Sequence, residues 1–192
     1  MKGAIVQRMR FYSHWNIAKD VAGENSNLAY LLGSIFPDYF ERLTRHRTYE
    51  SLDKIEERIR YINSIEDGIV KQYLIGTVMH YLCDYCCYAH SDRYFEWIHH
   101  RIFECDAQKL YKYGTRDKHI QRMNKFRTRT NVDVSKYIDK RNRYIAKLNS
   151  DKWWKDRRIM KLDISTAYSI CGYMYDQMTA TQGVTDTCME QF

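Results

Sequence analysis

Side chains that bind divalent metal ions are gathered within 25 residues of this chain: His80, Asp84, His90, His100 and Glu104. Imidazole and carboxylate groups together suit zinc. Six of the seven histidines lie between His14 and His100. The capacity for metal chemistry is therefore concentrated in the first half of the chain.

The spacing divides these five residues into two groups. His80 and Asp84 are four residues apart, which places them on one face of a helix, about one turn apart. If that helix continues, His90 lies about 9 Å beyond Asp84 and is turned away from it, so we expect it to serve a second metal ion. His100 and Glu104 are again four residues apart. With His90 they would supply three protein ligands and leave one position open, as in a catalytic zinc site.

Further candidate ligands lie upstream of these groups. Pro37 is the only proline in the chain, and it restricts the backbone just before Asp38. Asp38 and His46 could complete a four-ligand set with the first group. Taken alone, however, Asp38 is better explained as a turn residue and His46 as a surface histidine. For His14, the alternative is an amphipathic residue at the start of a helix.

The other histidines and the nearby cysteines are weaker candidates. We predict that His99 and His119 are not ligands, although the spacing leaves open an exchange of His99 for His100. Three cysteines follow His80 and resemble half of a zinc–cysteine site, but no second pair stands at a matching spacing: Cys83, Cys86 and Cys87. We interpret them as small buried residues around the site.

The elements that must position these residues are predicted to be helices. One proline and eight glycines leave few forced breaks. Apolar residues recur at helical spacing, and no segment shows the alternation of a strand. The predicted helices cover residues 14–22, 25–36, 50–64, 67–90, 95–113, 132–148 and 164–181. We therefore predict an all-α, single-domain multi-helix bundle over residues 1–192, with the metal site between helices.

The composition favours a globular protein. A hydrophobic content of 44% and an aromatic content of 15% argue against disorder, and 192 residues suffice for one domain with a core. No window approaches the ~18 apolar residues needed to span a bilayer, and the first residues lack the apolar core of a secretory signal. We expect a cytoplasmic protein whose six cysteines are thiols.

The net charge of +7 is unevenly distributed along the chain. Residues 107–161, here called the basic segment, carry 18 Lys and Arg against 5 Asp and Glu, whereas residues 162–192 carry no Lys or Arg. We expect the helix predicted within 162–183 to pack back on the core. The basic segment could attract an anionic membrane surface or single-stranded nucleic acid, or could be a solvated helix surface.

The ligand-rich core, residues 14–104, resembles the zinc-dependent phospholipase C family, whose all-helical fold is shared with single-strand-specific zinc nucleases. The resemblance rests on an ordered series of motifs: His14-Trp-Asn-Ile-Ala, Gly33-Ser-Ile-Phe-Pro-Asp38, His46, Gly76-x3-His80-x3-Asp84-x5-His90 and His100-x3-Glu104. It implies a cluster of two or three zinc ions. One would be held by Asp38, His46, His80 and Asp84, a second by His90, His100 and Glu104, and a third by His14 with Asp84 as a bridge.

The same resemblance implies a phospholipase C-like phosphodiesterase, a phosphoric ester hydrolase that uses a metal-activated water on a phospholipid or nucleotide. In it Asp38 would double as ligand and general base, and Tyr39 would contact the substrate. The alternative is a non-catalytic, metal-stabilised helical domain that binds nucleic acid or acidic partners through the basic segment.

Overall fold

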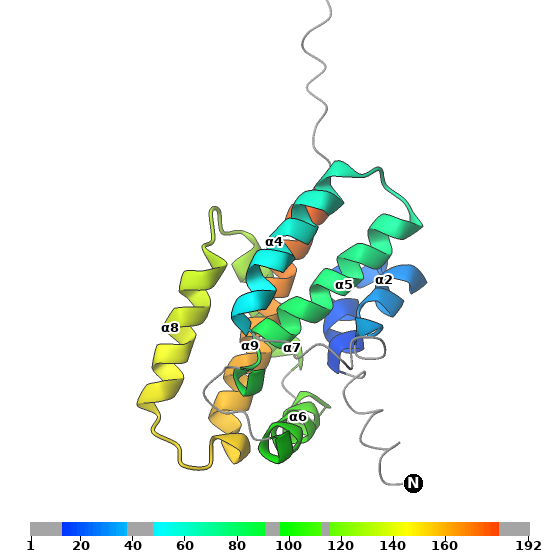
Figure 1. Ribbon diagram of the computed structural model, residues 1–192. Coiled ribbons are helices and arrows are strands. Elements are labelled where there is room, and N and C mark those ends of the chain that lie inside the picture. The colour runs from blue at the N-terminus through cyan, green and yellow to red at the C-terminus, as the bar shows by residue number, and fades with distance from the viewer. Residues whose placement is uncertain (1–12, 38–47, 91–96, 113–115, 181–192) are drawn as a thin grey trace, which may run out of the picture.

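The computed structural model describes residues 13–37, 48–90, 97–112 and 116–180, and all regular structure in these ranges is helical (Figure 1). The first half contains a helix over residues 13–22, the 3-10 turn η1 (Gly23–Asn25), α2 (Leu28–Gly33), α4 (Thr48–Ser64), α5 (Ile69–Tyr85) and the 3-10 turn η2 (Tyr88–His90). The second half contains α6 (Trp97–Lys112), α7 (Arg116–Arg127), α8 (Val134–Lys147), the 3-10 turn η4 (Trp153–Lys155) and α9 (Arg157–Thr179). The predicted all-α class is confirmed.

Two helices, α5 and α9, form the centre of the molecule. α9 packs against α4, α5, α6, α7 and α8. The second half of α5 is buried on every side, from Ile75 to Tyr85, which agrees with its mostly apolar sequence. Figure 1 shows α6 lying at the end of the bundle where α5 ends. His80 and Asp84, near the C-terminal end of α5, are therefore buried at the end of the bundle where α6 lies.

The apolar patterns locate most of the helices correctly. In α4 the apolar residues that recur at helical spacing form the buried face, with Ile55, Ile59 and Ile62 inside the core. α8 coincides with the predicted helix to within two residues at its start and one at its end. α9 begins seven residues earlier than predicted, because the Asp156 carboxylate caps its first turn by accepting from the Arg158 amide.

The prediction of one continuous helix over residues 67–90 is wrong. α5 ends at Tyr85, with Cys86 as its C-terminal cap, and η2 follows as a separate turn. A second departure is α7, for which no helix was predicted. Its buried face consists of His119, Met123 and Phe126 and packs on α9, where Gly172 leaves room for the Met123 side chain.

Candidate metal centre

Two glycines let α2 and α5 cross with their backbones in contact. A Cβ atom added at Gly33 would lie 2.1 Å from a backbone carbonyl oxygen of α5. One added at Gly76 would lie 2.0 Å from a backbone carbonyl oxygen of α2. No side chain tolerates such distances, so the close crossing requires glycine at both positions. Both residues belong to the sequence motifs, and both act at a distance from any ligand atom.

This crossing orients the imidazole of His80. The Ser34 carbonyl oxygen, just after α2, lies 3.0 Å from His80 Nδ1. A carbonyl oxygen can only accept a hydrogen bond, so Nδ1 carries the proton and donates it. The ring is completely buried, and its Nε2 lies 3.3 Å from Asp84 Oδ2. Such an outer hydrogen bond fixes the tautomer and the direction of a metal-binding histidine.

The first ligand group consists of His14, His80 and Asp84, whose donor atoms all lie within 4.8 Å of one another. His14 Nε2 lies 3.4 Å from Asp84 Oδ1, and the two imidazole rings are 4.2 Å apart between centroids. Burial raises the pKa of Asp84, but the neighbouring His90, His80 and His14 lower it by more than burial raises it. The pKa therefore lies well below its usual value. The carboxylate is therefore ionised and ready to bind a cation.

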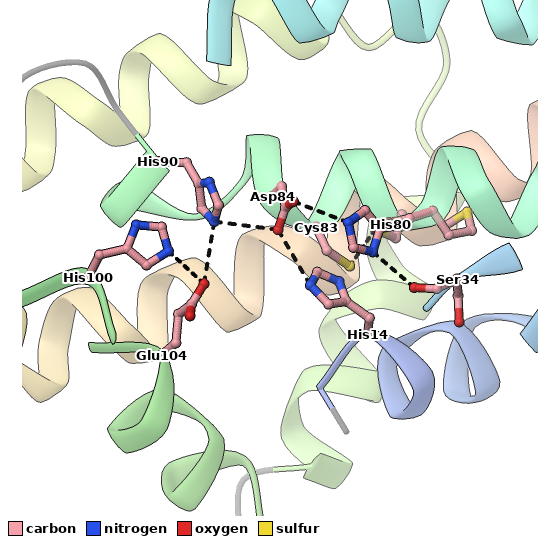
Figure 2. Close-up of polar contacts among 10 residues, drawn as sticks. His14, Ser34, His80, Cys83, Asp84, His90, His100 and Glu104 are labelled. Atoms are coloured by element: carbon pink, nitrogen blue, oxygen red, sulfur yellow. Dashed lines mark hydrogen bonds and ion pairs between the residues drawn. The ribbon is translucent and has the colours of Figure 1, made fainter. Parts of the chain in front are cut away.

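The second ligand group consists of His90, His100 and Glu104. His100 Nε2 lies 2.6 Å from Glu104 Oε1, across one turn of α6. His90 Nε2 lies 3.5 Å from the same oxygen, and its ring stands edge-on to that of His100 at 4.4 Å. The three side chains converge from η2 and α6 (Figure 2). The partners predicted from the spacing are therefore brought together.

Asp84 also joins the two groups, contrary to the expectation that His90 turns away from it. Its Oδ1 atom lies 3.5 Å from His90 Nε2 as well as close to His14, while Oδ2 faces His80 (Figure 2). The expectation failed because it assumed an unbroken helix. The end of α5 at Tyr85 folds the chain back, so that His90 returns to the level of Asp84. One carboxylate thus lies between both sets of imidazoles.

A buried ion pair holds the turn that carries His90. The Tyr88 amide of η2 donates to Asp163 Oδ2 on α9 at 2.6 Å. The other oxygen of Asp163 accepts from the Arg141 guanidinium of α8, and both side chains are almost completely buried. Burial raises the pKa of Asp163 to about 6 even with Arg141 beside it. α8 and α9 therefore help to position a ligand of the second group.

A second network ties the helix that carries His14 to α6, α7 and α9. The Asp20 carboxylate accepts hydrogen bonds from the hydroxyls of Tyr111 and Tyr168, at 2.9 and 2.5 Å, and from Arg116 Nε at 2.9 Å. Burial raises the pKa of Asp20, but these hydrogen bonds more than offset it and lower the pKa below its usual value. Since α6 also carries His100 and Glu104, the network fixes one ligand group relative to the other.

Six of the eight predicted ligands therefore meet in one place. Asp38 and His46 lie outside the described residues, as does Tyr39. His99 stacks on the Trp154 ring at 3.5 Å between centroids, so His100 is the one of the pair that lies with the other candidate ligands. His119 is buried against Tyr168, away from both groups.

Sequence reasoning missed the residues that orient the ligands. Ser34, Asp163 and Asp20 act through contacts between segments 46 to 148 residues apart in sequence. No local pattern distinguishes them from ordinary helix or turn residues. The two motif glycines, Gly33 and Gly76, were the one available signal, because a glycine within a helix often marks a place where another backbone approaches closely.

A cavity of about 100 Å³ opens beside the ligands. Its walls include His14, Asp84, His90 and Glu104, four cysteine thiols, and the apolar side chains of Ile17, Phe103, Ile164 and Ala167. The five cysteines among the described residues are thiols. Cys83, Cys86 and Cys87 all lie in this wall, where Cys83 and Cys86 are buried as predicted and Cys87 is half-buried.

Comparison with known proteins agrees with this geometry. The sequence model of a family described as zinc-dependent phospholipase C matches residues 11–155. The chain belongs to the zinc-dependent phospholipase C family. No curated protein and no solved structure matches the chain. The matched residues contain all six candidate ligands among the described residues. They also extend past Glu104 to residue 155, and so cover α8 and most of the basic segment.

The donor set of this phospholipase C family member fits zinc. It offers four imidazole nitrogens and two carboxylates in two groups of three. His80 Nε2 and Asp84 Oδ2 lie 3.3 Å apart, so that one cation could bind both atoms while Nδ1 donates to the Ser34 carbonyl. In the described part of the chain, no helix is long and apolar enough to span a bilayer.

Proposed function

We propose that this chain is a zinc-dependent phosphodiesterase that hydrolyses a phospholipid, and that it holds at least two zinc ions. One observation carries the proposal: two groups of three ligands meet at Asp84 on the wall of a largely apolar cavity. The second group supplies three protein ligands, which leaves a zinc coordination position for water or substrate. The mostly apolar wall suits contact with the glycerol end of a lipid better than with a nucleotide base and sugar.

The chain's own residues prepare the site for this chemistry. Asp84 is ionised because its pKa lies well below the usual value, and His80 presents Nε2 because Ser34 accepts the proton on Nδ1. When bound, zinc supplies Lewis acidity, which stabilises charge on a phosphoryl oxygen and makes water a stronger acid. We assign the general-base role to Asp38 and a substrate contact to Tyr39. Both assignments come from the family resemblance, since these residues lie outside the described part.

The first test combines zinc counting with a turnover assay. Untagged protein is analysed for zinc and assayed on a soluble short-chain phosphatidylcholine, by release of the phosphorylated headgroup. We expect turnover that a chelator abolishes and zinc restores. Asp38→Asn should keep its zinc and lose turnover. Unchanged turnover in that variant would remove Asp38 from the mechanism.

A neighbouring pair of histidines provides a matched control for the second ligand group. His100→Gln removes a candidate ligand at the site, whereas His99→Gln removes the neighbouring ring that stacks on Trp154. We expect His100→Gln to lose zinc and turnover, and His99→Gln to keep both. Equal loss in the two variants would contradict the ligand assignment.

Two outcomes would replace the proposed function. Cleavage of a single-stranded oligonucleotide, with no turnover of the phospholipid, would make the chain a nuclease. Zinc-loaded protein that turns over neither substrate would support a non-catalytic, metal-stabilised binding domain instead.

A further inference from the structure

The surface of α8 is divided into two opposite faces. Ile138, Arg141 and Ile145 are buried against the body of the molecule. The opposite face carries four exposed cations, here called the α8 cation row: Lys136, Lys140, Arg143 and Lys147. Their spacing of four, three and four residues keeps them within an arc of about 60° and along about 16 Å of the helix. Figure 1 shows α8 at one side of the molecule, beside α9.

Two exposed carboxylates lie near this row: Asp139 on α8, and Asp133 at the start of the helix. Lys136 lies 2.9 Å from Asp133, in an exposed pair that water and salt screen. Within the described part of the chain, Lys140, Arg143 and Lys147 form no ion pair with a carboxylate. The exposed face of α4 differs, because there Lys54 and Arg60 alternate with acidic residues: Asp53, Glu56 and Glu57. The α8 cation row is therefore a local feature and not the general character of the surface.

We propose that the α8 cation row docks on an anionic phospholipid surface. This inference rests on the proposed function, since a phospholipase meets its substrate in such a surface. A straight row of cations on a convex helix can meet many lipid phosphates at once, and Tyr144 beside the row is 57% exposed and suits the interface between headgroups and water. Arg122 and Lys125 on α7 are also exposed and extend the positive charge of the basic segment.

Single-stranded nucleic acid fits the same helix less well. Proteins that bind single strands combine positive charge with several aromatic side chains on which successive bases stack. Along α8, Tyr144 is the one exposed aromatic residue, because Tyr137 packs edge-on against the Phe126 ring at 5.0 Å. The row thus offers charge without a stacking surface.

The test is co-sedimentation of the full chain with vesicles. Wild-type protein is mixed with phosphatidylcholine vesicles, with or without phosphatidylglycerol, at low and at high salt. Binding should require phosphatidylglycerol and should weaken at high salt, because exposed charges are screened. Reversing two charges in Lys140→Glu/Lys147→Glu should weaken binding on the order of 30-fold or more, from about fivefold for each cation lost.

Lys54→Glu/Arg60→Glu on α4 is the control, because it changes the net charge by the same amount at exposed positions outside the row. It should bind nearly as well as the wild type. Equal loss in both double variants would overturn the row as a docking site, as would equal binding to vesicles without phosphatidylglycerol. Tight binding of a single-stranded oligonucleotide without binding to vesicles would overturn the lipid surface as the partner.

Turnover of a soluble short-chain phospholipid separates this inference from the proposed function. Lys140→Glu/Lys147→Glu should hydrolyse that substrate like the wild type. The row lies on the face of α8 opposite Arg141, which is the residue that links α8 to Asp163 and the candidate metal site. Absence of turnover in the wild type, with vesicle binding retained, would refute the proposed function and still support docking. Turnover with no vesicle binding would refute docking alone.

Discussion

Gly76 lies one turn before His80 on α5, and an alanine there has no room. Its Cβ atom would stand 2.0 Å from a carbonyl oxygen of α2, where ordinary contact begins at 3.4 Å. α2 would have to move away by about 1.4 Å. The Ser34 carbonyl lies just after α2, and its 3.0 Å hydrogen bond to His80 Nδ1 would stretch beyond 4 Å, roughly, and be lost.

The size of the effect follows from these two changes. Forcing a methyl group into a packed contact costs about 1–3 kcal/mol. Leaving the buried Nδ1–H of His80 without its acceptor costs about 1–3 kcal/mol more. We therefore expect Gly76→Ala to lower the free energy of unfolding by about 2–6 kcal/mol. Loss of the outer hydrogen bond should also weaken zinc binding by about 10–100-fold.

Gly68→Ala, at the cap of the same helix, is the matched control. Nothing lies within 4 Å of a Cβ atom at Gly68, and its backbone is extended, so alanine fits there. Urea unfolding of the metal-free protein gives the stability of each variant, and competition with a chromophoric chelator gives its zinc affinity. If Gly76→Ala matched Gly68→Ala in both measurements, the close crossing would have no part in orienting His80.

Three further predictions concern other contacts of the site and core. Arg141→Met strands the buried Asp163 carboxylate and should cost about 3–5 kcal/mol in urea unfolding, whereas Arg141→Met/Asp163→Leu should recover most of that stability but not the zinc content of the second group. Burial, then two nearby cations, lower the pKa of His119 to about 4. As the pH falls through about 6.5, His119 becomes protonated in the unfolded chain but not yet in the native state. The free energy of unfolding should therefore drop by up to about 3 kcal/mol between pH 6.5 and 4. His119→Phe should flatten this pH profile of stability. Asp84→Asn should lower zinc content at both groups by elemental analysis, while Asp106→Asn, on the exposed part of α6, should keep it.

The sequence was sufficient for the helices that bury an apolar stripe and for the ligand pairs within one turn. The stripe of α4 and the pairs His80–Asp84 and His100–Glu104 depend only on the helical period, which is a local property. α7 was not predicted because just three of its twelve residues are buried, and most of its other residues are polar or charged. Its position depends on the surface of α9, which no local pattern contains.

The end of α5 shows the same limit at the site itself. The segment from Asp84 to His90 contains no proline or glycine, so the helical pattern has no visible stop. In the structure, the Asp163 carboxylate captures the Tyr88 amide and η2 forms instead of another helical turn. The correct partner for His90 was thus predicted from an incorrect helix, and its contact with Asp84 was missed. A residue 75 positions away decided the geometry.

Asp84 makes the two ligand groups interdependent. Its Oδ1 atom is shared between His14 and His90, and its Oδ2 atom faces His80. The negative charge of this one carboxylate therefore acts on both ligand groups. A cation in one group would offset part of the negative charge that attracts a cation to the other. It would also fix the carboxylate in the orientation that the second cation needs. On one side Asp84 faces His80, which the hydrogen bond to Ser34 orients. On the other side it faces His90, which lies on η2 and is positioned by Asp163. Asp84 therefore joins the two ligand groups into a single site.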